Sequence, residues 1–184
     1  LEGISEESEE SDADIEKERQ DRQNGPITLK NESPTNRFQL ESLLFKGRFS
    51  LLRNAVDNKT EVGAHCTCKI SESTPQAQTE FELLANGQHE HVVHLIEAYS
   101  NSNFMFLFCE RLFEDVFARF TFLDYYTEEQ VSLLVRQVAA GLHWLHFKGI
   151  AHMAISPHNV MFTSKRSWIA RIVDFSEAVD LAEK

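Results

Sequence analysis

From about residue 38 onward, apolar and polar positions alternate in short runs, which predicts a series of β-strands. Polar turns at 57–60 and 100–102 separate some of these runs. The expected strands are 38–44, 49–56, 61–70, 92–99 and 103–109. Every residue from 104 to 109 is apolar, so we expect the last strand to be buried on both faces.

Helical spacing appears in two places. Residues 79–86 predict a short helix that stops at Gly87, because glycine commonly terminates helices. Residues 127–146 predict a long helix, since Thr127 and Gln130 have the spacing of a capping box. Its apolar residues recur at helical intervals and predict one buried stripe: Val131, Leu134, Val135, Val138, Leu142 and Leu145.

Two further apolar segments, 159–162 and 168–173, predict a small hairpin after the long helix. Strands and a short helix therefore come first, and a mostly helical part follows. This order indicates an α+β fold.

The negative charge of the chain is concentrated in its first residues. Residues 1–24 contain ten acidic and three basic residues, a net −7 of the whole chain's −11. Their only large apolar side chains are Leu1, Ile4 and Ile15, which bury too little surface to offset the entropy of ordering. We therefore expect residues 1–36 to be an acidic, disordered linker. Its serines precede acidic residues and are candidate phosphorylation sites, although a plain solubilising spacer is the simpler interpretation.

Composition excludes several classes of protein. A net charge of −11 argues against nucleic acid as a partner, because phosphate binding requires a basic face. No apolar run is long enough to span a membrane, and the acidic first residues do not form a signal peptide. Three cysteines cannot all pair in disulfides, which fits a reducing, cytoplasmic location.

Five short motifs then occur in a fixed order. They are Lys69 in a strand, Glu80 on the short helix, Glu110 after the last strand, the loop His152–Asn159 and Asp174-Phe175-Ser176. Together they resemble a protein kinase domain from Phe38 to the C-terminus. Smaller stretches are similar to the calcium/calmodulin-dependent group, in particular its titin, obscurin and myosin light-chain kinase branch, and most of all to an obscurin-type kinase domain.

The resemblance implies a bilobal protein kinase-like fold. Residues 37–110 would form an N-lobe with an antiparallel β-sheet and one helix, called αC in that family. Residues 111–184 would form the start of a helical C-lobe that is truncated here. In such a fold Lys69, Glu80 and Glu110 would lie where a nucleotide binds, and Asn159 and Asp174 where a metal ion binds. Two interpretations of these residues remain: they bind ATP and magnesium weakly, or they are structural relics that no longer bind a nucleotide.

The departures from the family pattern concern catalysis. Ala154 stands where the resemblance places the catalytic aspartate, and Ser156 where it places a lysine. The three glycine-loop positions read Phe45, Gly47 and Ser50, so one glycine remains. We therefore expect a catalytically inactive pseudokinase that needs no cofactor and acts as a protein-interaction scaffold. The alternative is a weakly active or nucleotide-binding serine/threonine kinase-like switch.

The likeness to giant muscle proteins implies a myofibrillar or sarcomeric partner. An aromatic run from Phe113 to Tyr126 is expected to lie mostly in the core, with any exposed part as the partner site. The candidates are Phe113, Phe117 and Phe120. Two clusters, 65–68 and 89–94, contain cysteines or histidines. We interpret them as buried free thiols and packing histidines rather than as metal sites.

Overall fold

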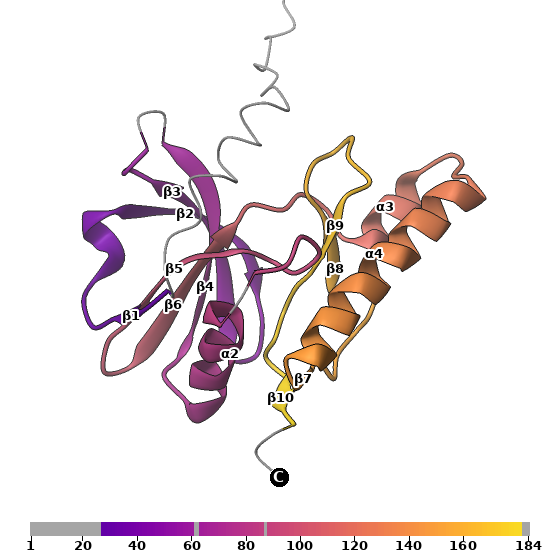
Figure 1. Ribbon diagram of the computed structural model, residues 1–184. Coiled ribbons are helices and arrows are strands. Elements are labelled where there is room, and N and C mark those ends of the chain that lie inside the picture. Colours follow the sequence, from indigo (N-terminus) through magenta and orange to yellow (C-terminus); the bar gives the residue numbers. More distant parts are fainter. Residues whose placement is uncertain (1–26, 61–62, 87, 182–184) are drawn as a thin grey trace, which may run out of the picture.

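A computed structural model describes residues 27–60, 63–86 and 88–181, which form two lobes (Figure 1). Within these residues, a six-stranded sheet of the first lobe has the order β1-β5-β6-β4-β3-β2. Its strands are β1 (Leu29–Lys30), β2 (Phe38–Lys46), β3 (Ser50–Asp57), β4 (Ala64–Glu72), β5 (Leu95–Ser100) and β6 (Phe104–Glu110). Neighbouring strands are antiparallel except for β1 and β5. The five predicted strands are confirmed to within a few residues.

Helix α2 (Pro75–Ala85) belongs to the first lobe and begins earlier than the predicted residue 79. The Thr74 hydroxyl accepts a hydrogen bond from the Ala77 backbone N–H at 3.2 Å, and Pro75 occupies the first helical position. Both features are typical of a helix start, because the first N–H groups of a helix lack partners inside it.

Strand β6 is buried as predicted, except at its first residue. Met105 and Leu107 belong to the core cluster that also contains residues of α2, while Phe108 stacks on Phe38 with 3.8 Å between ring centroids. Phe104 is 43% exposed at the start of the strand. The apolar pattern therefore identified a strand with core on both faces.

The second lobe contains helices α3 (Val116–Phe122) and α4 (Glu128–Phe147) and two small antiparallel pairs. These pairs are β7 (Ile150–Ala151) with β10 (Val179–Asp180), and β8 (Val160–Phe162) with β9 (Ala170–Ile172). The predicted hairpin and long helix are confirmed, including the capping box, in which Thr127 and Gln130 each accept a backbone N–H of the other. Helix α4 lies close to β9 because Gly141 faces it: a Cβ there would meet Ile172 Cδ1 at 2.8 Å.

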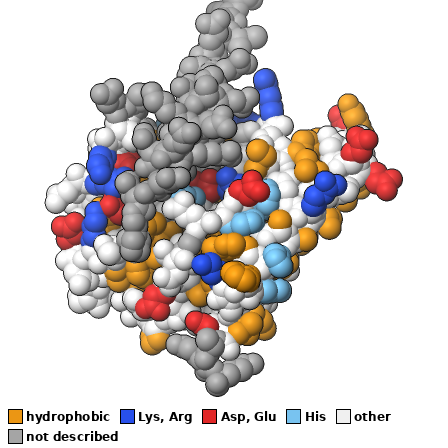
Figure 2. Space-filling model, viewed as in Figure 1, with side chains coloured by type: hydrophobic (Ala, Val, Ile, Leu, Met, Phe, Trp, Pro, Cys, Tyr) orange, Lys and Arg blue, Asp and Glu red, His pale blue; other side chains and the backbone are white. Residues whose placement is uncertain are grey.

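The predicted stripe on α4 is only partly buried. Leu134 and Leu145 are buried, but Val135 is 61% exposed, so the prediction is wrong at that residue. Leu133 and Phe147 are also exposed, and Figure 2 shows hydrophobic side chains on the surface over this helix. Within the described part of the chain, one face of α4 has no covering element.

The prediction that the disordered linker extends to residue 36 is wrong for residues 27–36. Residues 1–26 lie outside the described part, but β1 pairs with Ala98 and Tyr99 of β5, and the 3₁₀ helix η1 (Pro34–Asn36) follows it. Order therefore begins at least ten residues before Phe38. Apolar content alone did not predict this, because charged side chains contribute to holding the segment together with the core contacts of Ile27 and Leu29.

Arg37 is the centre of this charged contact. Its guanidinium bonds both oxygens of the buried Asp57, at 2.8 and 2.5 Å, and its Nη1 lies 2.6 Å from Glu97 Oε2. Glu97 also accepts hydrogen bonds from Lys30 of β1 and from the Tyr99 hydroxyl. Burial opposes the charge on both carboxylates, but these cationic and hydrogen-bonding partners hold their pKa values below the ordinary range.

We expect Arg37→Gln to lower the free energy of unfolding by about 2–4 kcal/mol, because it leaves Asp57 buried without its counter-charge. Amide exchange at Leu29 and Lys30 should accelerate as well. Urea titration and hydrogen-exchange mass spectrometry measure the two effects. Arg48→Gln is the matched control, since Arg48 contacts the exposed Phe49 ring. Equal effects of the two substitutions would show that the Arg37 contact is unimportant.

Candidate functional site

Lys69 lies between the two lobes, and its ammonium group contacts two carboxylates. Its Nζ is 2.7 and 2.9 Å from the two oxygens of Glu80 on α2, and 2.9 Å from Asp174 Oδ1 in the segment after β9. Glu80 is only 4% exposed. Burial opposes the charge on Lys69, but Glu80 and Asp174 outweigh it, so the pKa of the ammonium is raised. Three of the predicted site residues are therefore in direct contact.

Asp174 adopts a left-handed backbone conformation, with φ of 62°. Its carboxylate is 44% exposed, and Oδ1 also accepts the Ser176 backbone N–H at 3.4 Å. Burial raises its pKa, but Lys69 outweighs that effect, so the pKa lies below the ordinary value. The carboxylate is therefore charged at neutral pH and is paired with a cation of the chain itself.

The loop from His152 to Asn159 is held by hydrogen bonds around Ala154. His152 is buried, its Nε2 is 3.0 Å from the Val173 carbonyl oxygen, and its Nδ1 accepts the Ala154 N–H at 3.3 Å. Burial lowers the pKa of His152, so the ring is neutral. The Asn159 amide donates to the Ala154 carbonyl oxygen at 2.8 Å. The loop thus presents a methyl group at the position expected for the catalytic aspartate, which would accept a proton, and Ser156 adds no positive charge.

Asn159 and Asp174 are the residues that could hold a divalent ion. One oxygen of each side chain remains outside the contacts described above, and magnesium is commonly bound by one or two protein oxygens plus phosphate. No group of three or more His, Cys, Asp or Glu side chains suited to a metal occurs among the described residues.

The side chain of Glu110, a predicted nucleotide-site residue, contacts two groups of the chain itself. Its Oε1 accepts hydrogen bonds from the His94 backbone N–H at 2.8 Å and from Arg171 Nε at 3.0 Å. The side chain is only 14% exposed. The sequence motif placed this residue correctly at the end of β6 but did not reveal its partners.

The connection between the lobes follows Glu110, the last residue of β6. We call residues 111–114, between β6 and the α3 cap Asp115, the interlobe link. Its Phe113 N–H donates to the Phe162 carbonyl oxygen at 3.0 Å, and the Phe162 N–H donates to the Glu114 carbonyl oxygen at 2.9 Å. The link is thus paired with β8. Its shortness was readable from the spacing of the apolar strand and Asp115.

The glycine-loop positions lie at the turn between β2 and β3. The Gly47 N–H donates to the Ser50 carbonyl oxygen at 2.9 Å, and a Cβ at Gly47 would meet a ring carbon of Phe45 at 3.2 Å. Phe45 is 62% exposed. The turn therefore closes on itself with an aromatic ring beside its one glycine.

The expectation that most of the aromatic run is core is wrong. Helix α3 has two turns, and it buries Arg119 against carbonyl groups of residues 164–167 while its opposite side faces solvent. The exposed rings are Phe113, Phe117, Phe122, Tyr125 and Tyr126.

Phe117 and Phe120 differ in solvent exposure, although both are on α3. The Phe117 ring is 55% exposed and lies 4.7 Å from the ring of His158, whose Nδ1 is 3.1 Å from Asp115 Oδ2. Phe120 is half-buried and packs against Trp168 in the core cluster around β8 and β9. Of the three candidate partner residues, Phe113 and Phe117 are therefore at the surface.

The cysteine and histidine clusters pack as predicted. Cys66 and Cys68 are buried free thiols, and burial raises the pKa of Cys66 to about 12. The His89 ring stacks on Trp144 at 5.6 Å, and its Nδ1 accepts the His91 N–H at 3.1 Å.

A strand-rich lobe, a helical lobe and a lysine–glutamate–aspartate contact between them define a protein kinase-like domain. The family model of the protein kinase domain matches residues 38–184, so the chain belongs to this family. None of the described helices has the length and hydropathy that crossing a membrane demands.

Two proteins of similar sequence belong to narrower groups within this family. The chain is 55% identical over 178 residues to the muscle M-line assembly protein unc-89 of Caenorhabditis elegans, which covers 97% of this chain and 2% of that protein. It is 27% identical over 160 residues to the calcium/calmodulin-dependent protein kinase type II subunit delta of Oryctolagus cuniculus, covering 80% of this chain and 29% of that protein. The chain thus spans a small part of each.

Solved structures confirm the fold. The twitchin kinase region from C. elegans superimposes with a TM-score of 0.79 at 22% identity, covering 88% of this chain and 29% of that one. Titin kinase with its flanking domains gives a TM-score of 0.75 at 20% identity, covering 85% of this chain and 29% of that one. The predicted bilobal fold, with the first part of a C-lobe, is therefore confirmed.

We expect Asp174→Asn to lower the free energy of unfolding at pH 7 by about 1 kcal/mol, because the carboxylate is partly exposed and its pair with Lys69 is partly screened. Since the folded pKa of Asp174 lies below its ordinary value of 3.8, the contribution is complete above that pH and is lost as pH falls through the folded pKa. Thermal unfolding at pH 7 and pH 3 tests this. Glu177→Gln, at a nearby exposed carboxylate, is the control. An equal effect of Asp174→Asn at both pH values would contradict the ion pair.

Proposed function

We propose that this chain is a catalytically inactive kinase-like domain that acts as a protein-interaction scaffold in a muscle protein. The observation that carries the proposal is Ala154. The surrounding loop keeps its hydrogen bonds through His152 and Asn159, yet the side chain at its centre is a methyl group.

Phosphoryl transfer to a hydroxyl group requires a proton acceptor and positive charge near the transferred phosphate. A methyl group accepts no proton, and Ser156 provides no cation. Lys69 remains, but its ammonium already contacts Glu80 and Asp174. The missing groups act together in catalysis, so the loss of several is expected to abolish turnover rather than slow it.

A nucleotide-binding switch is the second candidate, and the presence of Lys69, Asn159 and Asp174 favours it. Lys69, Asn159 and Asp174 would hold the phosphates and a divalent ion if ATP bound, and the bound nucleotide would supply a phosphoryl group. Binding would require Asp174 to exchange its bond with Lys69 for the metal ion. The contacts that Lys69 already makes with Glu80 and Asp174 favour the scaffold over this switch.

The proposed partners are proteins of the myofibril. The relative that shares 55% identity is named as an M-line assembly protein, and a sarcomeric location for this chain follows as part of the proposal. We place the partner site at Phe113 and Phe117, which expose apolar rings beside Arg111 and His158. Exposed aromatic side chains are frequent anchors of protein interfaces.

The unmodified chain should transfer no phosphate above background to peptide or protein substrates. Ala154→Asp alone should not restore activity, because Ser156 and the altered glycine loop remain. Transfer of labelled phosphate from ATP measures this, with calcium/calmodulin-dependent protein kinase type II as the positive control. Robust turnover by the unmodified chain would sink the proposal. Magnesium-dependent stabilisation by ATP without turnover would favour the switch.

Phe117→Ala should weaken capture of myofibrillar proteins at least tenfold while leaving the melting temperature nearly unchanged, because the ring is mostly exposed. Phe120→Ala should instead destabilise the fold, by about 2–4 kcal/mol, since that ring packs against Trp168. Quantitative pull-down with ATP and magnesium, or with EDTA, measures binding, and thermal unfolding measures stability. Undiminished capture by folded Phe117→Ala would remove this surface as the partner site.

A further inference from the structure

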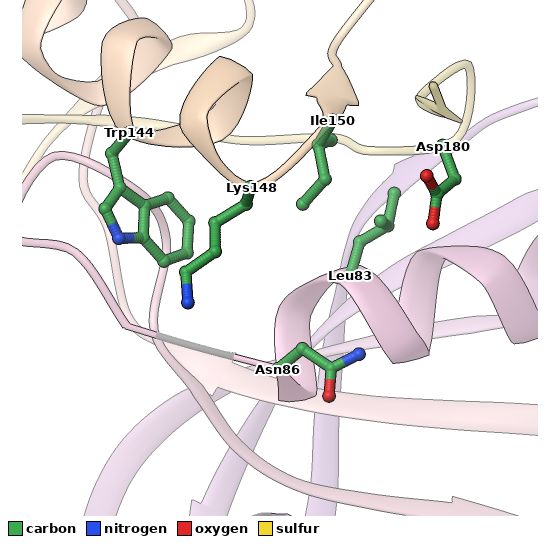
Figure 3. A pocket seen from close by; sticks show the side chains of 6 residues that line it. All are labelled: Leu83, Asn86, Trp144, Lys148, Ile150 and Asp180. Carbon is green, nitrogen blue, oxygen red and sulfur yellow. The ribbon is translucent and has the colours of Figure 1, made fainter. Parts of the chain in front are cut away.

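A small pocket opens between the ends of helices α2 and α4 and the β7–β10 pair (Figure 3). It has a volume of about 80 Å³. The lining residues are Leu83, Asn86, Trp144, Lys148, Ile150 and Asp180. None of them belongs to the Lys69 contact or to the surface around Phe117, so neither catalysis nor the proposed partner site accounts for the pocket.

The pocket is apolar inside and polar around its opening. Leu83 and Ile150 are buried, at 7% and 4% exposure, and Figure 3 shows their side chains approaching each other from α2 and β7. The Trp144 ring forms a wall, and Lys148 Nζ lies 5.9 Å from its centroid. The ammonium of Lys148 extends from the end of α4 toward α2, and the amide of Asn86 lies at the end of α2 and points away from Lys148.

These polar groups have unused hydrogen-bonding capacity. Among the described residues, neither the Lys148 ammonium nor the Asn86 amide has a hydrogen-bond partner, although each can donate at least two bonds. Asp180 places a carboxylate on the other side of the pocket. A ligand would therefore meet an apolar cavity with the Lys148 ammonium on one side, the Asp180 carboxylate on the other and the Asn86 amide at the end of α2.

The volume restricts what can enter. Pockets for drug-sized ligands and cofactors measure roughly 300–1,000 Å³, and a cavity that admits benzene measures about 150 Å³. A space of about 80 Å³ accommodates one branched aliphatic side chain. A nucleotide is too large for this space.

We propose that this pocket is a second protein-docking site, which binds an extended segment of a partner carrying a Leu, Ile or Val side chain next to an acidic residue. The aliphatic side chain packs between Leu83 and Ile150, the acidic residue pairs with Lys148, and the Asn86 amide bonds the main chain of the segment. The site extends the proposed scaffold function, and it uses residues separate from Phe117.

Capped tripeptides test the proposal directly. The probes are acetyl-Glu-Leu-Glu-amide, acetyl-Lys-Leu-Lys-amide and acetyl-Glu-Ala-Glu-amide, titrated into the ¹⁵N-labelled full chain. The chain has two tryptophans, so the Trp144 indole resonance reports on the pocket and the Trp168 resonance is an internal control. We expect the Glu-Leu-Glu peptide to shift the Trp144 resonance and to bind at least tenfold more tightly than the other two.

Charge reversal gives the matched comparison. Lys148→Glu should invert the preference so that the Lys-Leu-Lys peptide binds more tightly, whereas Lys165→Glu, at an exposed lysine of the β8–β9 loop, should leave it unchanged. Leu83→Phe should fill the pocket and abolish the response, with thermal unfolding as the check that the variant folds. Asn86→Ala keeps the cavity and should weaken binding, which provides a second test if Leu83→Phe does not fold.

Several outcomes overturn the proposal. Equal binding of Glu-Leu-Glu and Glu-Ala-Glu would mean that surface charge alone attracts the peptides. A Trp144 resonance that moves with protein concentration would assign the pocket to a second copy of the chain. If the peptide shifts the Trp144 resonance only after the residues that follow Leu181 are removed, those residues themselves occupy the pocket. Loss of peptide binding in folded Phe117→Ala would also overturn it, because that residue lies outside the pocket.

Discussion

The ammonium group of Lys69 lies between a carboxylate of the first lobe and a carboxylate of the second. Glu80 is almost fully buried, and a buried carboxylate without a counter-charge would carry a large desolvation penalty. Lys69 offsets that penalty and also contacts Asp174. This one side chain of β4 therefore connects the sheet with helix α2 and with the segment that follows β9. The position of His152 and the loop around Ala154 follow from this, because His152 bonds Val173, the residue before Asp174.

This arrangement has a consequence for function. The same three side chains could contact a nucleotide, but in this chain they already satisfy one another. The loop around Ala154 keeps its hydrogen bonds, but the side chain at its centre is a methyl group. The scaffold role that we propose therefore depends on the outer surfaces of the domain. Two of them differ in character: exposed aromatic rings around Phe117, and a small apolar pocket with a lysine at its opening.

The kinase-like fold could be predicted because its evidence is local. The alternation that predicted β6, the capping box of α4 and the motif residues Lys69 and Asp174 all lie within short segments. Predictions failed where contacts between distant segments determine whether a residue is ordered or buried. Residues 27–36 were assigned to a linker by their low apolar content, yet Lys30 and Arg37 reach Glu97 and Asp57 on distant strands. Phe117 and Phe120 were grouped together, although only Phe120 meets Trp168.

The sequence by itself determined the order of strands and helices, the residues of the Lys69 contact and the replacement of the expected acid by Ala154. These follow from residue type and from spacing along one segment. Only the tertiary structure decided that Glu110 pairs with Arg171, that the interlobe link bonds β8, and that Leu83, Trp144 and Ile150 surround a pocket. Each of these features joins residues far apart in the chain, and no local pattern of hydropathy or charge specifies which distant segments meet.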